Sequence, residues 1–85
     1  MPYRIEITTQ AAKQLAALEP LTMKRVAARI DALAVEPRPP SARKLATKEG
    51  FYRIRVGDYR VIYQVADRRI LVTIIRIGHR RDAYR

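Results

Sequence analysis

The dipeptide Gly57-Asp58 separates two runs of alternating residues, 51–56 and 59–65. A two-residue connection between such runs is typical of a β-hairpin, and glycine suits its first position because glycine adopts positive φ without steric cost. The short turn also sets the register of the hairpin, with Val56 opposite Tyr59 and Arg55 opposite Arg60. We therefore expect the fold to be built around this hairpin.

Counting outward from the turn assigns each side chain of the hairpin to one of two faces, because side chains alternate along a strand. One face is apolar and aromatic and is expected to be the core: Tyr52, Ile54, Val56, Tyr59, Val61 and Tyr63. The other face carries Arg53, Arg55 and Arg60. Like charges directly across a ladder are unfavourable by up to about 1 kcal/mol, so this cluster favours a ligand-binding surface over a merely solvated one.

The remaining elements follow from periodicity and from capping residues. Residues 3–7 alternate as a half-buried strand does. Thr8 or Thr9 is expected to cap a helix that ends at Glu19-Pro20, and Thr22 to cap a second helix whose apolar stripe runs to Ala34. Residues 36–50 contain three prolines and are expected to form an irregular basic loop with Leu45 as an anchor. The nearly continuous apolar run 69–77 predicts a strand covered on both sides.

This order predicts an α+β fold, β-α-α-β-β-β, in which a small antiparallel-rich sheet has an N-terminal helical hairpin packed on one face. The chain has 85 residues, and no linker or repeat divides it, so one domain spanning 1–85 is expected. It has no cysteine, and the lone His79 does not make a zinc site unaided, so neither a metal nor a cofactor is implied. A signal peptide and an apolar run of about 18 residues are both lacking, which predicts a cytoplasmic protein without a membrane partner.

Charge indicates the kind of partner. Eighteen Lys and Arg residues against eight Asp and Glu give a formal net charge of +10, which attracts nucleic acid, an acidic protein, or both. After the last strand, Gly78 is followed by His79, Arg80, Arg81 and Tyr84. The end of this strand is thus expected to bring an imidazole, guanidinium groups and a phenol to the edge of the arginine cluster.

Two segments, GFYRIRVGDYRVIYQV at 50–65 and RIGHRRDAY at 76–84, resemble the RelE branch of the RelE/ParE toxins, as does the order of elements. The resemblance implies the toxin of a type II toxin-antitoxin pair, neutralised by a cognate acidic antitoxin, that cleaves messenger RNA in the ribosomal A site. It implies that the ribose 2′-hydroxyl attacks the adjacent phosphorus. The catalytic positions of the family fall on Arg53, Arg55, Arg60, Arg80 and Tyr84.

The sequence departs from the family pattern at Arg53 and Arg55, where the archetype carries lysines, one of them proposed as the general base. Arginine stays protonated in proteins and does not readily take a proton. We therefore expect either that His79 or Tyr84 is the base, or that the site mainly positions the RNA and stabilises charge. Lys44, Lys48 and Arg81 are candidate RNA-binding residues.

Other interpretations remain open. On the same scaffold, a ParE-type toxin inhibits DNA gyrase without nuclease activity, and a third possibility is an RNA-binding module without catalysis. The arginine cluster taken alone also fits a solubilising surface. His79 taken alone is more often a surface or capping histidine, and Tyr84 either packs the chain end or stacks on a base, a contact worth about 1 to 3 kcal/mol.

Overall fold

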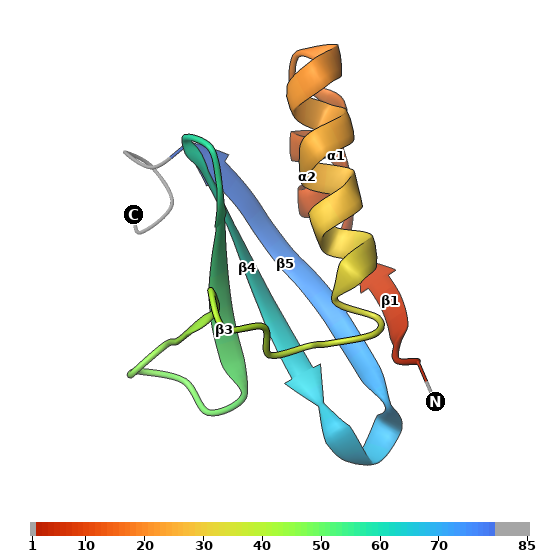
Figure 1. Ribbon diagram of the computed structural model, residues 1–85, viewed down its shortest axis with the longest axis vertical. Coiled ribbons are helices and arrows are strands. Elements are labelled where there is room, and N and C mark those ends of the chain that lie inside the picture. Colours follow the sequence, from red (N-terminus) through yellow and green to blue (C-terminus); the bar gives the residue numbers. More distant parts are fainter. Residues whose placement is uncertain (1, 80–85) are drawn as a thin grey trace.

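The computed structural model describes residues 2–79, which form a five-stranded mixed sheet with two helices on one face (Figure 1). The elements in chain order are β1 (Arg4–Ile7), α1 (Thr9–Ala16), α2 (Pro20–Ala32), β2 (Arg43–Lys44), β3 (Phe51–Val56), β4 (Tyr59–Ala66), a 3-10 turn (Asp67–Arg69) and β5 (Leu71–His79). The strand order is β1-β5-β4-β3-β2, with β1 parallel to β5 and all other neighbours antiparallel. The expected α+β class and the helical layer on one face are confirmed.

Helix α1 begins where a threonine cap was expected. The Thr8 hydroxyl accepts a hydrogen bond from the Ala11 backbone N–H at 3.1 Å and donates one to the Ile75 carbonyl at 3.0 Å. A hydroxyl serves both purposes because it is donor and acceptor at once. The helix ends at Ala16, earlier than the expected stop at Glu19-Pro20.

Helix α2 begins earlier than expected, and the assignment of Thr22 as its cap was wrong. Pro20 is the first helical residue, a position that suits proline because its missing N–H is not needed there. The Glu19 carboxylate is the cap: it accepts from the Leu21 backbone N–H at 2.8 Å and from the Thr22 hydroxyl at 3.2 Å. Within residues 2–79, neither α2 nor another helix is long and apolar enough to cross a membrane.

The hairpin has the predicted register. Val56 lies opposite Tyr59, Arg55 opposite Arg60 and Tyr52 opposite Tyr63, and Gly57 has a φ of 59°. The expected inner face packs beneath the helices, where α2 supplies Val26 and Ile30 and its C-cap residue is Leu33. Twelve residues make up this core: Ala11, Val26, Ile30, Leu33, Ile54, Val56, Val61, Tyr63, Val65, Val72, Ile74 and Ile77.

The segment 36–50 is not wholly irregular, contrary to the prediction. Arg43 and Lys44 form the short edge strand β2, which pairs with β3. Two residues are too few to show a period, so the sequence pattern carried no sign of this strand. Leu45, expected as an anchor, is half-buried, and its backbone N–H donates to the Phe51 carbonyl at 2.9 Å.

Strand β5 lies between β1 and β4, as its apolar character predicted, but it runs from Leu71 to His79 and starts later than expected because of the preceding 3-10 turn. Arg76 is paired with Ile62 and Ile74 with Tyr63, so Ile75 is an extra residue in the ladder. Such a β-bulge changes the direction of the side chains around it. Ile74 and Ile77, three residues apart, are consequently both buried while Arg76 lies on the opposite face.

Candidate functional site

Five arginines from four strands share the sheet surface opposite the helices, and we call this surface the arginine face: Arg43, Arg53, Arg55, Arg60 and Arg76. Arg76, Ile62, Arg53 and Arg43 form one row across β5, β4, β3 and β2. Arg60 and Arg55 form a second row, beside Gly78. Neighbouring strands lie about 4.8 Å apart and the two rows are about 7 Å apart along the strands, so the five positions make one compact patch.

The strands that form the arginine face, β2, β3, β4 and β5, contain no acidic residue, so within residues 2–79 they give it only positive charge. Arg43 and Arg55 are exposed, whereas Arg53, Arg60 and Arg76 are half-buried with their Nε atoms shielded from solvent. Each of these three side chains still keeps part of its surface exposed. A planar guanidinium with a permanent charge matches the oxygens of a phosphate, so the face is suited to binding phosphate groups.

The second row of the arginine face has the charge to stabilise a bound phosphate group. Arg55 and Arg60 lie directly opposite each other, and Gly78 adds no side chain beside Arg60. Donors held in place before the reaction stabilise developing charge without the cost of reorganising. A phosphate placed over this row would meet two guanidinium groups at once.

The structure does not bring His79 to the arginine face. His79 is paired with Tyr59, and the two rings contact edge to face with centroids 5.5 Å apart and an interplanar angle of 83°. Tyr59 lies on the helix side of the sheet, and His79 follows it there because Gly78 occupies the outer position. The expectation that β5 delivers an imidazole to the arginine cluster is therefore wrong. Arg80, Arg81 and Tyr84 lie outside the described residues.

The two candidate lysines occupy different places. Lys44 is paired with Tyr52, whose ring belongs to the core side, so Lys44 is not aligned with the arginine face. Its neighbour Arg43 is aligned instead, directly opposite Arg53. Lys48 lies in the loop before β3, with its Nζ 5.3 Å from the centroid of the Phe51 ring. Phe51 and Arg53 share a face, so Lys48 borders the arginine face at its far end.

Sequence reasoning missed Arg43 and Arg76 as members of the patch. Arg43 belongs to a strand too short to recognise. Arg76 stands in an apolar run, and its orientation depends on the bulge at Ile75. Ile75 and Ile77 flank Arg76, so regular alternation also fits the sequence, and nothing in it showed that Ile74 shares the buried face with Ile77.

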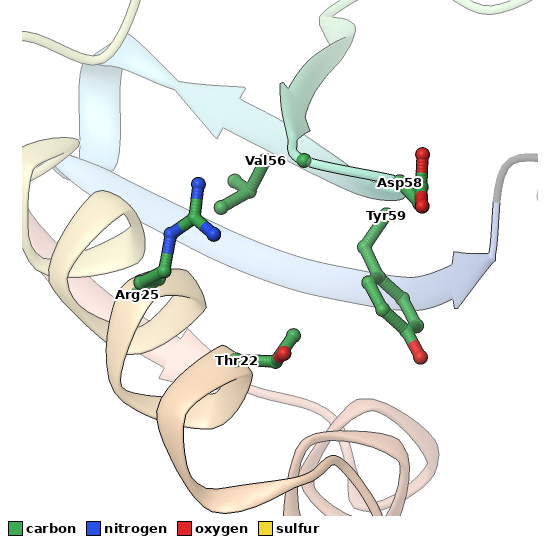
Figure 2. A pocket seen from close by; sticks show the side chains of 6 residues that line it. Thr22, Arg25, Val56, Asp58 and Tyr59 are labelled. Carbon is green, nitrogen blue, oxygen red and sulfur yellow. The ribbon is translucent and has the colours of Figure 1, made fainter.

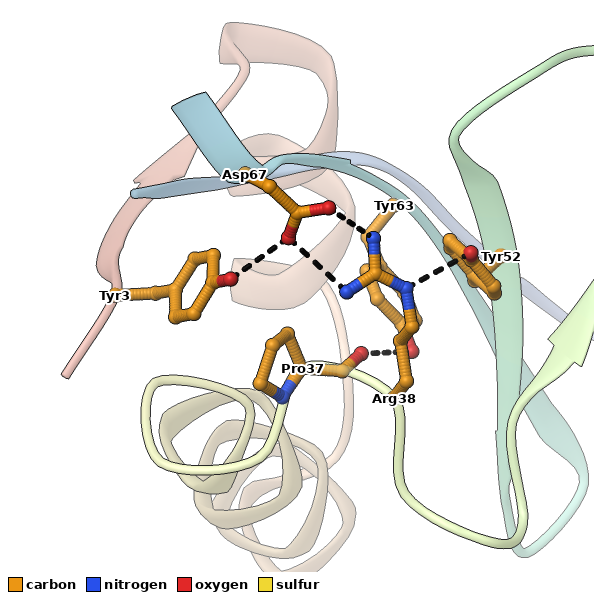
Figure 3. Close-up of polar contacts among 6 residues, drawn as sticks. All are labelled: Tyr3, Pro37, Arg38, Tyr52, Tyr63 and Asp67. Atoms are coloured by element: carbon orange, nitrogen blue, oxygen red, sulfur yellow. Dashed lines mark hydrogen bonds and ion pairs between the residues drawn. The ribbon is translucent and has the colours of Figure 1, made fainter. Parts of the chain in front are cut away.

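A second polar cluster fastens the 36–50 segment to the sheet, and we call it the loop anchor: Tyr3, Arg38, Tyr52 and Asp67 (Figure 3). The Arg38 guanidinium donates to both Asp67 oxygens, at 3.1 and 2.8 Å, and through Nε to the Tyr52 hydroxyl at 2.9 Å. The Tyr3 hydroxyl donates to Asp67 Oδ1 at 2.7 Å. The Arg38 cation also lies 5.2 Å from the centroid of the Tyr52 ring.

These contacts shift the ionisation of the groups involved. The hydrogen bonds from Arg38, and secondly from Tyr3, lower the pKa of Asp67. The bond to the carboxylate likewise raises the pKa of Tyr3, and the bonds to Asp67 and Tyr52 raise the pKa of Arg38. Burial raises the pKa of Tyr63 to about 12, so its hydroxyl stays protonated and donates to the Pro37 carbonyl at 2.8 Å.

A pocket of about 200 Å³ lies on the other side of the sheet, between α2 and the β3–β4 turn (Figure 2). Thr22 and Arg25 line it from the helix, and Val56, Asp58 and Tyr59 line it from the hairpin. Its mixed polar and apolar lining holds neither a basic cluster nor a nucleophile paired with a base. The concave site and the arginine face are therefore separate features of the molecule.

Comparison with known proteins places the chain in a family. Residues 5–84 match the model of the ParE toxin of the type II toxin-antitoxin system parDE. Toxin RelG of Mycobacterium tuberculosis is 36% identical over 100% of this chain and 99% of its own length. Putative toxin RelE1 of Methanocaldococcus jannaschii is 33% identical, over 100% of this chain and 98% of its own.

Solved structures agree with these sequence matches. A chain of the archaeal RelE-RelB complex from Pyrococcus horikoshii superposes with a TM-score of 0.85 and 34% identity, over 98% of this chain and 100% of that one. A chain of the RelBE2 toxin-antitoxin complex from Mycobacterium tuberculosis superposes with a TM-score of 0.79 and 30% identity, over 93% of this chain and 99% of that one. Fold and sequence together show that the protein belongs to the RelE/ParE superfamily of type II toxin-antitoxin toxins and is RelE-like.

Proposed function

We propose that this toxin is a metal-independent endoribonuclease that cleaves messenger RNA in the ribosomal A site. The observation that carries the proposal is the placement of Arg53, Arg55 and Arg60 on one accessible sheet face, extended by Arg43 and Arg76. The similarity to RelE-named toxins over the full chain supports the same function. The net charge of +10 favours a polyanionic substrate.

In the proposed reaction the ribose 2′-oxygen attacks the adjacent phosphorus, and the bond from phosphorus to the 5′-oxygen breaks. The 2′-hydroxyl loses its proton, and the 5′-oxygen gains one as it leaves. Arg55 and Arg60 stabilise the charge that accumulates on the phosphorane oxygens, and Arg53 binds the backbone beside them. Arg80 and Tyr84 are proposed to complete the site from the end of the chain.

The protonated arginines leave the general base to another group. His79 faces the helix side of the sheet beside Tyr59, which argues against it as the base. We infer that Tyr84 takes this role, or that the ribosome holds the RNA in line and the toxin mainly stabilises charge. Lys48 and Arg81 are proposed to add backbone contacts around the site, whereas Lys44 is left out because it is paired with Tyr52 and does not share the arginine face.

Replacement of Arg60 tests the proposal. In primer extension on a translated reporter, brief expression of the native toxin should produce cuts within codons. Loss of one donor to the phosphorane should slow Arg60→Ala by about 100-fold or more. Arg68→Ala is the matched control, since Arg68 is exposed in the turn between β4 and β5, at the other end of the hairpin from Gly57. His79→Ala should retain most of the activity.

Equal cleavage by the Arg60→Ala and Arg68→Ala variants would contradict the assignment of the site. A large loss in His79→Ala, with a changed pH profile between pH 5 and 9, would restore the imidazole as a candidate base. The Arg60→Ala and His79→Ala variants are also measured by thermal denaturation, so that a loss of cleavage is not confused with a loss of folding.

We also propose that a cognate acidic antitoxin binds the toxin. The similar chain from Mycobacterium tuberculosis was solved in a toxin-antitoxin complex, and the one from Pyrococcus horikoshii was solved in a RelE-RelB complex. A net charge of +10 also favours an acidic partner. Co-expression with the neighbouring reading frame should restore growth and yield a complex on size-exclusion chromatography.

Gyrase inhibition is the second candidate function, because the matching family model is that of the ParE toxin. The two functions separate in one experiment. Double-strand DNA breaks with intact messages after expression would favour gyrase inhibition, whereas cut messages with intact DNA would favour RNA cleavage.

A further inference from the structure

We propose that Arg43 is an additional RNA-binding residue of the arginine face and that the ion pair of Arg38 with Asp67 is the device that positions it. The inference rests on the proposed RNA-binding role of the face. It adds a residue from the edge strand β2 to the contacts that β3 and β4 provide. Arg38 and Asp67 are positioning residues, because they act on the RNA only through Arg43.

The place of Arg43 in the sheet carries the first step. Its Cα is paired directly with that of Arg53, so two cations occupy adjacent positions on one face. Arg43 is exposed, and within residues 2–79 its guanidinium has neither an ion pair nor a hydrogen bond. A phosphate that contacts both side chains would meet two positive charges at once.

The path of the chain carries the second step. Strand β2 has only two residues, so its own pairing with β3 is a weak constraint. Arg38 lies five residues before Arg43 and is tied to both oxygens of Asp67 and to the Tyr52 hydroxyl. Pro39 and Pro40 stand between these points, and each fixes its own φ. Fixing Arg38 therefore restricts where β2 can lie, because the segment between them is short and stiff.

Further contacts confine the same segment without replacing the anchor. The Ala42 backbone N–H donates to the Pro39 carbonyl at 2.9 Å, and Arg29 donates to the Ser41 hydroxyl at 3.2 Å. Asp67 belongs to the turn between β4 and β5, far from Arg43 in the sequence. Without its carboxylate, Arg38 would lose its only ion pair among residues 2–79, and β2 would be held less firmly against β3. Arg53, Arg55 and Arg60 would stay in place because longer strands hold them.

The test is a double-mutant cycle of Arg43→Ala and Asp67→Ala, with binding to RNA as the measurement. The probe is a short single-stranded 2′-O-methyl RNA, which lacks the attacking hydroxyl, titrated at several salt concentrations. Arg43→Ala should weaken binding by about 10-fold. It should also reduce the slope of log K against log salt by about 0.7, the value for one lost phosphate contact on a single strand.

Asp67→Ala should reproduce both changes, and the double variant should match Arg43→Ala alone. Asp67→Glu should recover most of the slope, because it keeps the carboxylate. Glu19→Ala is the control for stability, since it removes the cap of α2 far from β2. It should lower the melting temperature without changing the slope.

An Arg43→Ala slope equal to that of Arg68→Ala, or no binding of the native toxin to the probe, would overturn the role of Arg43. Losses that multiply in the double variant would overturn the positioning role of Asp67. Failure of this inference can be distinguished from failure of the proposed RNA cleavage. Intact messages together with an Arg43-dependent slope would reject cleavage alone, and cut messages with unchanged slopes would reject this inference alone.

Discussion

Asp67 shows how much a single residue depends on partners that are distant in the sequence. In the sequence it stands in a turn beside Arg68, and nothing nearby indicates an ion pair. In the structure it accepts hydrogen bonds from Arg38, 29 residues away, and from Tyr3, 64 residues away. Periodicity and turn chemistry describe local structure only, so they did not predict the loop anchor. The arginines of the hairpin were predictable because a two-residue turn fixes their register.

The lowered pKa of Asp67 makes its contribution to stability depend on pH. A carboxylate with a lower pKa in the folded state stabilises the fold above the ordinary aspartate pKa of about 3.9. This stabilisation is lost as the pH falls through the lower folded value. Asp67→Asn should therefore be less stable than the native chain at pH 7, and the gap in urea midpoints should close towards pH 2. Asp31→Asn, at an exposed site on α2, is the control, and a gap that stays constant with pH would contradict the assignment.

The β3–β4 hairpin is the element that the sequence predicted best, because its turn, its register and its two faces all follow from one glycine. Three other features were not predicted from the sequence, each for an identifiable reason. The start of α2 was misplaced because Pro20 was read as a helix breaker and not as a first helical residue. Strand β2 was too short to recognise, and the direction of Arg76 depended on a bulge.

Gly57→Ala is the test of the turn. Gly57 has a φ of 59°, and a left-handed conformation costs a residue with a Cβ about 1 to 2 kcal/mol. An added Cβ would come no nearer than 4.0 Å to the Arg25 side chain, so the cost comes from the backbone and not from crowding. Urea denaturation should show this loss for Gly57→Ala and a smaller one for Asp58→Ala. Equal losses would mean that the glycine is not required by its φ.

At the scale of the whole molecule, the sheet separates two chemical environments. Its inner surface packs against α1 and α2, while its outer surface gathers five of the eighteen basic residues into one patch. The sequence predicted the two layers and the sign of the charge. It did not predict that His79 would fall on the helix side, because that placement requires the pairing of β4 with β5.

The salt dependence of RNA binding tests whether the arginine face or the total charge binds RNA. Each phosphate neutralised on a single strand contributes about 0.7 to the slope of log K against log salt. The five arginines of the face therefore account for a slope of up to about 3.5, and the proposed contacts of Lys48, Arg80 and Arg81 raise the limit to about 5.6. The native toxin should fall within this limit on the 2′-O-methyl probe. A much steeper slope would show that the basic residues of the helices also bind the RNA.

The bulge in β5 has a second consequence, which concerns the carbonyl that it releases. Ile75 has no paired residue on β4. Its carbonyl accepts a hydrogen bond from the hydroxyl of Thr8, the residue that caps α1. One irregular peptide thus turns Arg76 outward and at the same time fastens the start of the first helix. The Thr8 hydroxyl therefore connects the helical layer to the sheet at the position of the bulge.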